Sequence, residues 1–360
     1  MLRQSRKLAH LRHAQSLSDG PAHTGLQEVQ LLHNCLPGFG LGDVSLQTAV
    51  AGVVLPHPVM INAITGGAPD VAQTNRDLAK LAKAAQCAMA VGSQYASLEN
   101  KSVRNTFALV REEHPDGIFL ANLGAHVTGD EAQEAVDMLG AQALQIHLNV
   151  GQELVMAEGD RDFSGYLERI AAVVRRLRVP VIVKETGCGM AAEQVRQLAA
   201  VGVAAIDVGG AGGTNFLAIE AARSGQALSP ELLAWGVPTA TSLVEAKAVL
   251  PAGVSLIASG GLRTAADMVK ALALGAHAVA VAGPVLRQLA VSGDQAVRWL
   301  HDLRQEMQLF MVLCGAKTIP ALHEAPLVIT GRTAEWLRAR GLYPDSRSAF
   351  RQGRSYPDQQ

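Results

Sequence analysis

The sequence predicts an α/β fold: a single (β/α)8 TIM barrel with N- and C-terminal extensions and a long insertion after the sixth strand. From residue 58 onward, short apolar runs alternate with stretches in which apolar residues recur every three or four positions. This is the pattern of strand–helix units around a parallel sheet. The runs number eight, which is the number of strands that closes such a barrel. A chain of 360 residues is long enough for one barrel with additions.

The eight expected strands are, in chain order, 58–64, 88–93, 118–124, 143–149, 180–185, 204–210, 255–261 and 278–283. Residues 1–57 then form an N-terminal arm and lead-in, residues 58–283 hold the eight units, and residues 284–360 form the final helices and a C-terminal tail. The stretch from about 212 to 240 is longer than an ordinary strand–helix connection, so we expect a lid or an inserted element there. No low-complexity linker interrupts the chain, and we expect one domain over residues 1–360.

The composition excludes several classes of protein. Lys and Arg number 31 against 32 Asp and Glu, so the chain lacks the basic field of a nucleic-acid-binding protein. With 49% hydrophobic residues, it has too many core-forming side chains to be disordered. No apolar run reaches the roughly 18 residues that a membrane span needs. We therefore expect no nucleic-acid partner and no membrane segment.

The cysteines and the N-terminal residues indicate the cellular compartment in which we expect the protein. The four cysteines are scattered and form no Cys-x-x-Cys pair, which favours a reducing, cytoplasmic location. Residues 1–17 contain no apolar segment of a secretory signal. They are rich in arginine and poor in acidic residues, as a transit peptide would be, but we favour a basic arm that serves the site.

Glycines at the ends of the last two expected strands predict a phosphate site. The seventh strand ends in Ser259-Gly260-Gly261-Leu262-Arg263, and the eighth ends in Ala282-Gly283. Paired glycines let backbone N–H groups approach a phosphate, and the helix expected at 264–272 would aim its positive end at it. Arg263 would add a charge-assisted hydrogen bond. Barrels of this class commonly hold a phosphate at this position.

Polar residues at other strand ends favour a flavin. Lys184, at the end of the fifth strand, is either a Schiff-base nucleophile or a cation directed at an anionic ring or substrate. The first three strands end in Thr65, Ser93 and Asn122, whose neutral hydrogen-bonding groups suit a polar heterocycle. Together with the phosphate site, these residues predict flavin mononucleotide (FMN) across the barrel mouth, with Lys184 near its pyrimidine ring.

A series of motifs runs in order along almost the whole chain. They are Arg6-Lys7, residues 62–67 (NAITGG), Ser93-Gln94, residues 121–124 (ANLG), 147–153 (HLNVGQE), 159–163 (GDRDF), Lys184-Glu185, residues 212–214 (GGT) and 260–264 (GGLRT). From residue 6 to about 340, this series resembles the type 2, FMN-dependent isopentenyl-diphosphate delta-isomerases. The HLNVGQE and GDRDF motifs are specific to that family, whereas the glycine-pair element is shared among flavin barrels.

The resemblance implies an isomerase that interconverts isopentenyl diphosphate and dimethylallyl diphosphate by a 1,3-allylic proton shift over reduced FMN, in isoprenoid biosynthesis. It also implies NADPH as reductant, Mg²⁺, and assembly as a homotetramer or homo-octamer. The implied FMN contacts are Ala63, Ile64, Thr65, Ser93, Asn122, Lys184, Thr214, Gly260, Gly261, Arg263, Ala282 and Gly283. The implied substrate contacts are Arg6, Lys7, Ser93, Gln94, Tyr95 and Gln152. Gln152, His147 and Asn149 are the implied catalytic residues, and Glu153 is the implied Mg²⁺ ligand.

The residue types agree with diphosphate chemistry. A carboxylate such as Glu153 suits a hard cation that is shared with substrate phosphates. His147 and Asn149 alternate along one strand and therefore face the same side, the barrel interior. Other interpretations stay open: His147 as a core histidine, Gln152 and Glu153 as caps of the next helix, and Arg6-Lys7 as a solvated tail.

One position departs from the family pattern. After Ser93-Gln94 the family usually has arginine, whereas this chain has Tyr95. Tyrosine offers one O–H where arginine offers five N–H donors, so the change bears on the diphosphate and not on the flavin. Two alternative functions stay open. One is an FMN-dependent 2-hydroxyacid oxidase, although the histidine base expected after the seventh strand is missing, and the other is a non-catalytic flavin-binding paralogue.

Overall fold

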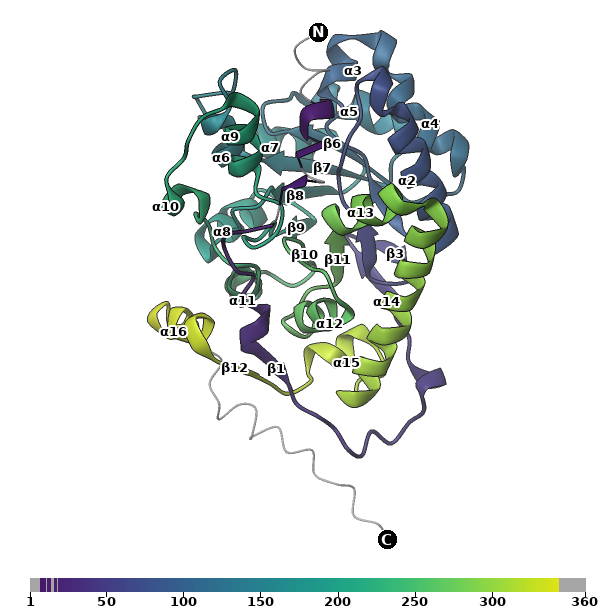
Figure 1. Ribbon diagram of the computed structural model, residues 1–360, viewed down its shortest axis with the longest axis vertical. Helices are drawn as coiled ribbons and strands as arrows, with labels where there is room; N and C mark the ends of the chain where they lie inside the picture. Colours follow the sequence, from purple (N-terminus) through teal and green to yellow (C-terminus); the bar gives the residue numbers. More distant parts are fainter. Residues whose placement is uncertain (1–6, 11, 14–15, 18, 343–360) are drawn as a thin grey trace.

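The computed structural model describes residues 7–10, 12–13, 16–17 and 19–342, and a closed barrel of eight parallel strands lies at its centre (Figure 1). The barrel strands are β4 (Val59–Ile61), β5 (Ala88–Ala90), β6 (Phe119–Gly124), β7 (Ala143–Leu148), β8 (Val181–Glu185), β9 (Ala205–Asp207), β10 (Ser255–Ala258) and β11 (Ala278–Val281). Strand β11 pairs with β4 and closes the ring, with Val279 opposite Val59. The predicted fold class and the eight expected strands are confirmed.

Several strands are shorter than predicted. The strands expected at 58–64, 204–210 and 255–261 end at Ile61, Asp207 and Ala258. The residues beyond these ends include glycines, which weaken strand pairing, and polar side chains that turn to the barrel mouth. The ladder therefore stops where the functional residues begin.

Helices surround the barrel (Figure 1). The longer ones are α2 (Ala72–Ala85), α4 (Asn105–Glu113), α5 (Gly129–Leu139), α7 (Tyr166–Arg176), α8 (Ala192–Ala200), α11 (Thr239–Val249), α12 (Ala265–Ala273), α13 (Gly283–Val291) and α14 (Gly293–Leu313). In α5, Val136 and Leu139 are buried, Thr128 and Glu131 form a capping box at the start, and Gly140 ends the helix in a left-handed conformation. Within the described part of the chain, no helix is both long and apolar enough to cross a membrane.

Shorter elements complete the structure. They are η1 (Leu26–Glu28), η2 (Leu41–Asp43), η3 (Pro69–Val71), α3 (Tyr95–Glu99), η4 (Lys101–Val103), α6 (Val150–Val155), α15 (Ile319–His323) and α16 (Gly331–Ala339). The insertion expected after the sixth strand consists of α9 (Phe216–Ser224) and α10 (Pro230–Leu233). Side-chain caps start both helices: Asn215 accepts from Ala218 N, and Ser229 accepts from Leu232 N. Helix α9 contacts α6, so the insertion lies beside the segment that follows β7.

A hairpin closes the N-terminal end of the barrel. Strands β2 (Thr48–Val50) and β3 (Val53–Leu55) pair antiparallel within the segment expected only as a lead-in. Val50 and Leu55 pack on interior side chains of the barrel strands, including Met60 and Ile182. The Thr48 hydroxyl donates to His277 O at 2.8 Å and fixes the hairpin in place. This end of the barrel is therefore filled by apolar side chains.

A second small sheet joins distant parts of the sequence. Strand β1 (Val29–Leu31) pairs antiparallel with β12 (Leu327–Ile329), with Val29 opposite Ile329. Glu28 extends the junction, because its carboxylate accepts the backbone N–H of Arg332 and Thr333 at the start of α16. Figure 1 shows this purple-to-yellow junction in the lower part of the view, between α16 and α15.

Candidate active site

A cavity of about 840 Å³ opens at the C-terminal ends of the barrel strands. Every residue predicted to contact FMN lines it: Ala63, Ile64, Thr65, Ser93, Asn122, Lys184, Thr214, Gly260, Gly261, Arg263, Ala282 and Gly283. The same cavity is lined by Lys7, Tyr95, His147, Asn149, Gln152 and Glu153. The fold thus brings the predicted flavin and diphosphate residues to one place, although they come from segments spread over most of the chain.

Lys184 lies at the floor of this cavity. Its side chain is 12% exposed, and Nζ donates to Glu185 O at 2.7 Å and lies 3.9 Å from Asp207 Oδ2. The neighbouring Glu185 turns away, and its carboxylate accepts the backbone N–H groups of residues 187–189. Burial raises the pKa of Glu185 to about 7 despite these hydrogen bonds. Lys184 therefore faces the cavity, while Glu185 holds the loop after β8.

The Gly260-Gly261 pair forms a surface made of backbone. Gly260 and Gly261 have φ of +101° and +76°, and a Cβ on them would lie 2.0 Å from Gly210 O and 2.4 Å from Gly212 O. Any larger residue would push these two loops apart. The loops can pack this closely only because both are rich in glycine.

The helix that meets the cavity here is not the one we expected. Helix α12 starts with its own capping box, in which Asp267 accepts from Arg263 N and Thr264 N. Helix α13 instead begins at Gly283 beside the cavity, and no side chain caps its start. The positive end available to an anion is therefore that of α13.

Arg263 meets an anion from the N-terminal arm. Its Nη2 lies 2.8 Å from Asp19 Oδ2, and it also donates to the carbonyl oxygens of Gly212 and Gly261. Arg287 lies 3.6 Å from the same carboxylate oxygen. Asp19 and Arg287 were not among the predicted site residues. The sequence shows both charges but not that they meet, because Asp19 lies 244 positions from Arg263.

His147 is held at the cavity wall by the amide of Asn122. The ring Nδ1 lies 2.8 Å from Asn122 Oδ1. Enclosure of the ring, together with the nearby positive charges of His126, Lys184 and Lys7, lowers the pKa of His147 to about 3. The imidazole is therefore neutral at neutral pH. A histidine that bound a diphosphate by charge alone would instead be a cation, so His147 does not act in that way.

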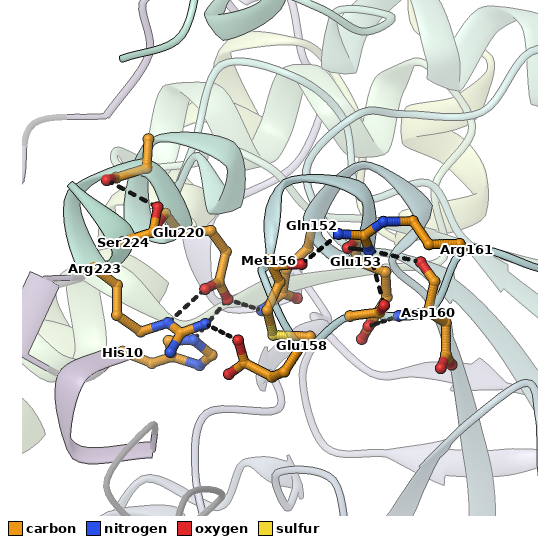
Figure 2. Close-up of polar contacts among 12 residues, drawn as sticks. His10, Gln152, Glu153, Met156, Glu158, Asp160, Arg161, Glu220, Arg223 and Ser224 are labelled. Carbon is orange, nitrogen blue, oxygen red and sulfur yellow. Dashed lines mark hydrogen bonds and ion pairs between the residues drawn. The ribbon is translucent and has the colours of Figure 1, made fainter. Parts of the chain in front are cut away.

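Helix α6 and the loop after it carry other residues that were predicted for the substrate and the metal ion. Asn149 Nδ2 donates to Glu153 Oε1 at 2.8 Å, and Asp160 N donates to Glu153 Oε2 at 2.9 Å. Arg161 donates to four backbone carbonyls between residues 153 and 160 and so fixes this loop (Figure 2). Glu153 thus ties α6 to the loop and does not cap its own helix.

Glu220 is a site residue that we did not predict. It lies on α9 with 0% exposure, and its carboxylate accepts from Gln152 Nε2 at 2.8 Å and from Arg223 Nε at 2.7 Å, and bonds His10 Nε2 at 2.7 Å (Figure 2). Burial alone would raise its pKa, but the bonds from His10, Gln152 and Arg223 lower the pKa to about 2. Arg223 also binds Glu158 across the gap to the α6 loop. A lone carboxylate within the apolar run FLAIEAA was the available signal.

Known proteins are similar in sequence to this chain over almost its whole length. The isopentenyl-diphosphate delta-isomerase of Geobacillus sp. (strain WCH70) is 47% identical over 344 residues, covering 95% of this chain and 98% of that protein. The chain belongs to the isopentenyl-diphosphate delta-isomerase family. The isopentenyl-diphosphate delta-isomerase of Symbiobacterium thermophilum is 46% identical over 351 residues, covering 95% and 96% of the two chains. A model of the FMN-dependent dehydrogenase family matches residues 100–329, which supports FMN as the cofactor of this isomerase-family chain.

Solved structures of mandelate oxidase share the fold at lower identity. A mutant with the monooxide FMN adduct has a TM-score of 0.64 at 21% identity, covering 89% of this chain and 92% of that chain. The enzyme with (S)-2-phenylpropionate has a TM-score of 0.64 at 19% identity, covering 90% and 97%. This likeness shows the barrel that the isomerase family uses, and nothing of its chemistry.

The residues of this isomerase-family site fit FMN. Thr65 Oγ1 is buried at the cavity wall and has no hydrogen-bond partner among the described residues, so it can bond a ligand. The glycine surface, Arg263 and the start of α13 offer donors to a phosphate. Lys184 offers positive charge at the opposite end of this set, on the barrel floor.

The fit to Mg²⁺ rests on one carboxylate. Among the described residues, no group of three or more His, Cys, Asp or Glu side chains is placed to hold a metal ion. Glu153 is the predicted ligand, and both of its oxygens accept from neutral donors. A cation that keeps most of its waters and shares substrate phosphates needs only one or two carboxylates, so Glu153 fits that mode and not a closed protein site.

The predicted substrate residues are placed unequally. Arg6 lies outside the described residues. Lys7 reaches the site, and its Nζ donates to Ser93 O at 2.9 Å. Gln94 does not face the cavity, contrary to the prediction: it is fully buried, with Nε2 donating to Ala135 O and Oε1 accepting from Asn122 N. Its neighbours Ser93 and Tyr95 line the cavity, so the middle residue of the three points to the opposite side.

Tyr95, at the position where the resemblance leads us to expect arginine, packs against a histidine. Its ring lies edge-on to the His126 ring with centroids 4.5 Å apart. Both residues line the cavity near Lys7 and His147. The position is therefore on the side of the cavity that Lys7 and His147, both predicted for the substrate, also line.

Proposed function

We infer that this protein is an FMN-dependent isopentenyl-diphosphate delta-isomerase, which interconverts isopentenyl diphosphate and dimethylallyl diphosphate by a 1,3-allylic proton shift over reduced FMN. The observation that carries this inference is the single cavity that joins the flavin residues to the 147–153 segment. In the reaction a proton is added at the terminal alkene carbon and another leaves C2. The double bond moves and there is no net redox change.

Bound reduced FMN supplies a proton donor and a stabilising π-face beside the alkene. The protein supplies position and charge. Lys184 places positive charge at the floor, where it favours an anionic reduced ring. Gln152 lines the cavity and is held at both ends: its amide N–H donates to Glu220 Oε1 at 2.8 Å, and its oxygen accepts from Asn149 Nδ2 at 3.4 Å. Gln152, His147 and Asn149 are our proposed catalytic residues.

The arm and the insertion enclose the substrate. Lys7 binds the carbonyl of Ser93 on one side, and His10 binds Glu220 of α9 on the other. The arm therefore spans the cavity between the loop after β5 and the inserted helix. Closure of this kind excludes water from a reaction centre that water would quench. Lys7 and Glu153, the second through Mg²⁺, are proposed to hold the diphosphate.

Further features of this proposal come from the family. NADPH is proposed to keep the flavin reduced, and the protein is proposed to act in the cytoplasm as a homotetramer or homo-octamer. The main alternative is a 2-hydroxyacid oxidase. The segment after β10 carries Leu262 and Arg263 at the cavity and offers no histidine base there, which disfavours that alternative.

The test is turnover by the FMN-loaded protein, reduced with NADPH without oxygen, with Mg²⁺ and isopentenyl diphosphate. We expect dimethylallyl diphosphate by proton NMR, and no oxidation of lactate or glycolate in air by the same preparation. Turnover of the hydroxy acids, or none of the diphosphate, would contradict the proposal. Calorimetry with isopentenyl diphosphate then separates a non-catalytic paralogue, which would bind FMN but not the diphosphate.

A further inference from the structure

Beneath the cavity floor lies a buried aspartate that the reaction described above does not use. Asp207 is the last residue of β9 and is 0% exposed. It pairs in register with Lys184 of β8, so the two side chains extend from neighbouring strands at the same level of the barrel. Asp207 does not line the cavity, but three residues that contact it do: Lys184, Asn62 and Ser259.

The contacts of Asp207 tie four strand ends together. Asn62 Nδ2, after β4, donates to Oδ2 at 3.0 Å, and Ser259 Oγ, after β10, donates to Oδ1 at 2.5 Å. Gly209 N donates to Oδ1 at 3.2 Å, and Lys184 Nζ lies 3.9 Å from Oδ2. These are the partners that a buried carboxylate needs if it is to remain charged inside a protein.

The charge of Asp207 opposes that of Lys184. The cation lies at the cavity floor and the anion lies behind it, so the pair places its positive end toward the cavity and limits the field there. Reduction adds negative charge to a flavin. A cation nearby favours the reduced form, and an anion behind that cation offsets part of the effect.

We propose that Asp207 is a positioning residue whose negative charge sets the reduction potential of the bound FMN by moderating Lys184. The proposal rests on the placement of the flavin given under Proposed function. It predicts a direction: loss of the anion makes the bound flavin easier to reduce, and loss of the lysine makes it harder to reduce.

The experiment is a spectroscopic measurement of the midpoint potential of bound FMN at pH 7 in the FMN-loaded protein. In Asp207→Asn we expect the ratio of reduced to oxidised flavin, at fixed solution potential, to rise at least tenfold, which is a shift of about 30 mV for a two-electron couple. In Lys184→Gln we expect the ratio to fall. Both oxygens of Asp207 accept from N–H donors, so the NH2 group of an asparagine would face a donor in either orientation. Asp207→Ser is therefore the second neutral variant, with room for a water molecule.

Ser259→Ala is the matched control. It removes one donor to Asp207 but leaves both charges in place, so the carboxylate becomes less neutralised and the potential should fall slightly. If these substitutions acted only by loosening the cavity floor, with no effect of charge, the midpoint potential of bound FMN would shift in the same direction in Ser259→Ala and in the Asp207 variants. Opposite signs therefore support the proposal, and equal signs overturn it.

Other outcomes also decide the matter. A ratio of reduced to oxidised flavin that stays within threefold of the parent's in both Asp207 variants would overturn the proposal. Loss of FMN from both variants with an unchanged far-ultraviolet circular dichroism spectrum would also overturn it, because an anion that only moderates Lys184 is not needed for binding. Failure of the parent protein to bind FMN would contradict the proposed function instead.

Discussion

The two ends of the barrel use the same eight strands for opposite purposes. At the N-terminal end, Val50 and Leu55 of the hairpin pack on apolar side chains and fill the interior. At the C-terminal end, the strands finish in groups such as Asn62, Lys184 and Asp207, and a cavity opens above them. The difference shows where each property resides. The closed end supplies packing that stabilises the fold, and this offsets the cost of burying charge at the open end.

The largest expected effect is on stability at the closed end. Leu55 is 2% exposed, so Leu55→Ala should lower the free energy of unfolding by about 2–5 kcal/mol, through lost burial and a cavity. FMN affinity should stay within twofold of the parent. Urea unfolding and a flavin fluorescence titration measure the two quantities. The control is Val54→Ala on the same hairpin, where the side chain is 57% exposed. Equal losses in both variants, or a parallel loss of flavin, would mean that the two ends are not separate.

At the open end, the largest effect should be on the cofactor. Arg263→Ala should weaken FMN binding by about 1.5–3 kcal/mol, or roughly 10–150-fold, through loss of a charge-assisted phosphate contact. Lys184→Ala should also weaken it through loss of charge near the ring. The free energy of unfolding of the FMN-free protein should change little in Arg263→Ala, because the ion pair between Arg263 and Asp19 lies near the surface and such pairs contribute little. Asp19→Asn is the control and should bind FMN at least as tightly. Unchanged FMN affinity in Arg263→Ala would remove Arg263 from the phosphate site.

Glu153→Gln tests the proposed metal contact. The Mg²⁺ concentration for half-maximal turnover should rise about tenfold, because a carboxylate ligand is replaced by a neutral amide. Flavin content should not change, since Glu153 lies on α6 and not at the glycine surface. Asp162→Asn, at the rim of the same cavity, should leave the Mg²⁺ requirement as it is. Equal Mg²⁺ dependence in parent and Glu153→Gln would contradict the assignment.

A buried histidine at the closed end should make stability depend on pH. Burial lowers the pKa of His57 to about 4, although its bond to Ala85 O raises it. Between pH 6.5 and 4 the unfolded chain binds a proton that the folded chain does not, so stability falls as pH falls, by at most about 1.4 kcal/mol per unit. His57→Gln should be less stable than the parent at pH 7, and the gap should narrow toward pH 5. His301→Gln, on an exposed side chain, is the control. Urea unfolding that shows a constant gap would refute the effect.

The smallest expected effect concerns the departure from the family pattern. Tyr95→Arg should lower the KM for isopentenyl diphosphate severalfold and leave kcat nearly unchanged, if the diphosphate is held alike in ground and transition states. The gain is limited because the substitution removes the ring contact with His126. Tyr95→Phe keeps that contact without adding charge and serves as the control. A folded, FMN-binding arginine variant with an unchanged or higher KM would place the diphosphate elsewhere.

Much of the barrel and its mouth could be predicted because the signals are local. Alternating strand and helix patterns mark each unit, and the C-terminal ends of parallel strands meet at one mouth. Lys184, Asn122 and the glycines of the last two strand ends therefore come together as the sequence predicts. A close backbone contact is also visible in the sequence, because it requires glycine: a side chain at Gly260 or Gly261 would collide with a backbone oxygen.

The rest depends on contacts that no local pattern carries. In the sequence, residues 48–55 have no pattern that sets them apart from the rest of the N-terminal segment. Only the tertiary structure shows that they form a hairpin that covers the N-terminal end of the barrel. Gln94 sits beside two cavity residues but points away, which follows from the turn after β5 and not from its type. Glu220 and Asp207 are single acids in apolar runs, and their partners lie on other segments of the chain. The sequence marks such residues as unusual without saying which groups neutralise them.

The pairing of β1 with β12 constrains the order in which the protein is completed on the ribosome. Thr330 Oγ1 bonds Glu28 O across 302 positions of sequence. At typical rates of synthesis, the segment around Val29 waits about 15–60 s for its partner strand to be made. During that time β1 has an unpaired edge, and Leu31 and Val29 are open to other chains. Strand β1 is therefore among the last parts of the chain to reach its final contacts, and it is a place where a nascent chain needs protection from aggregation.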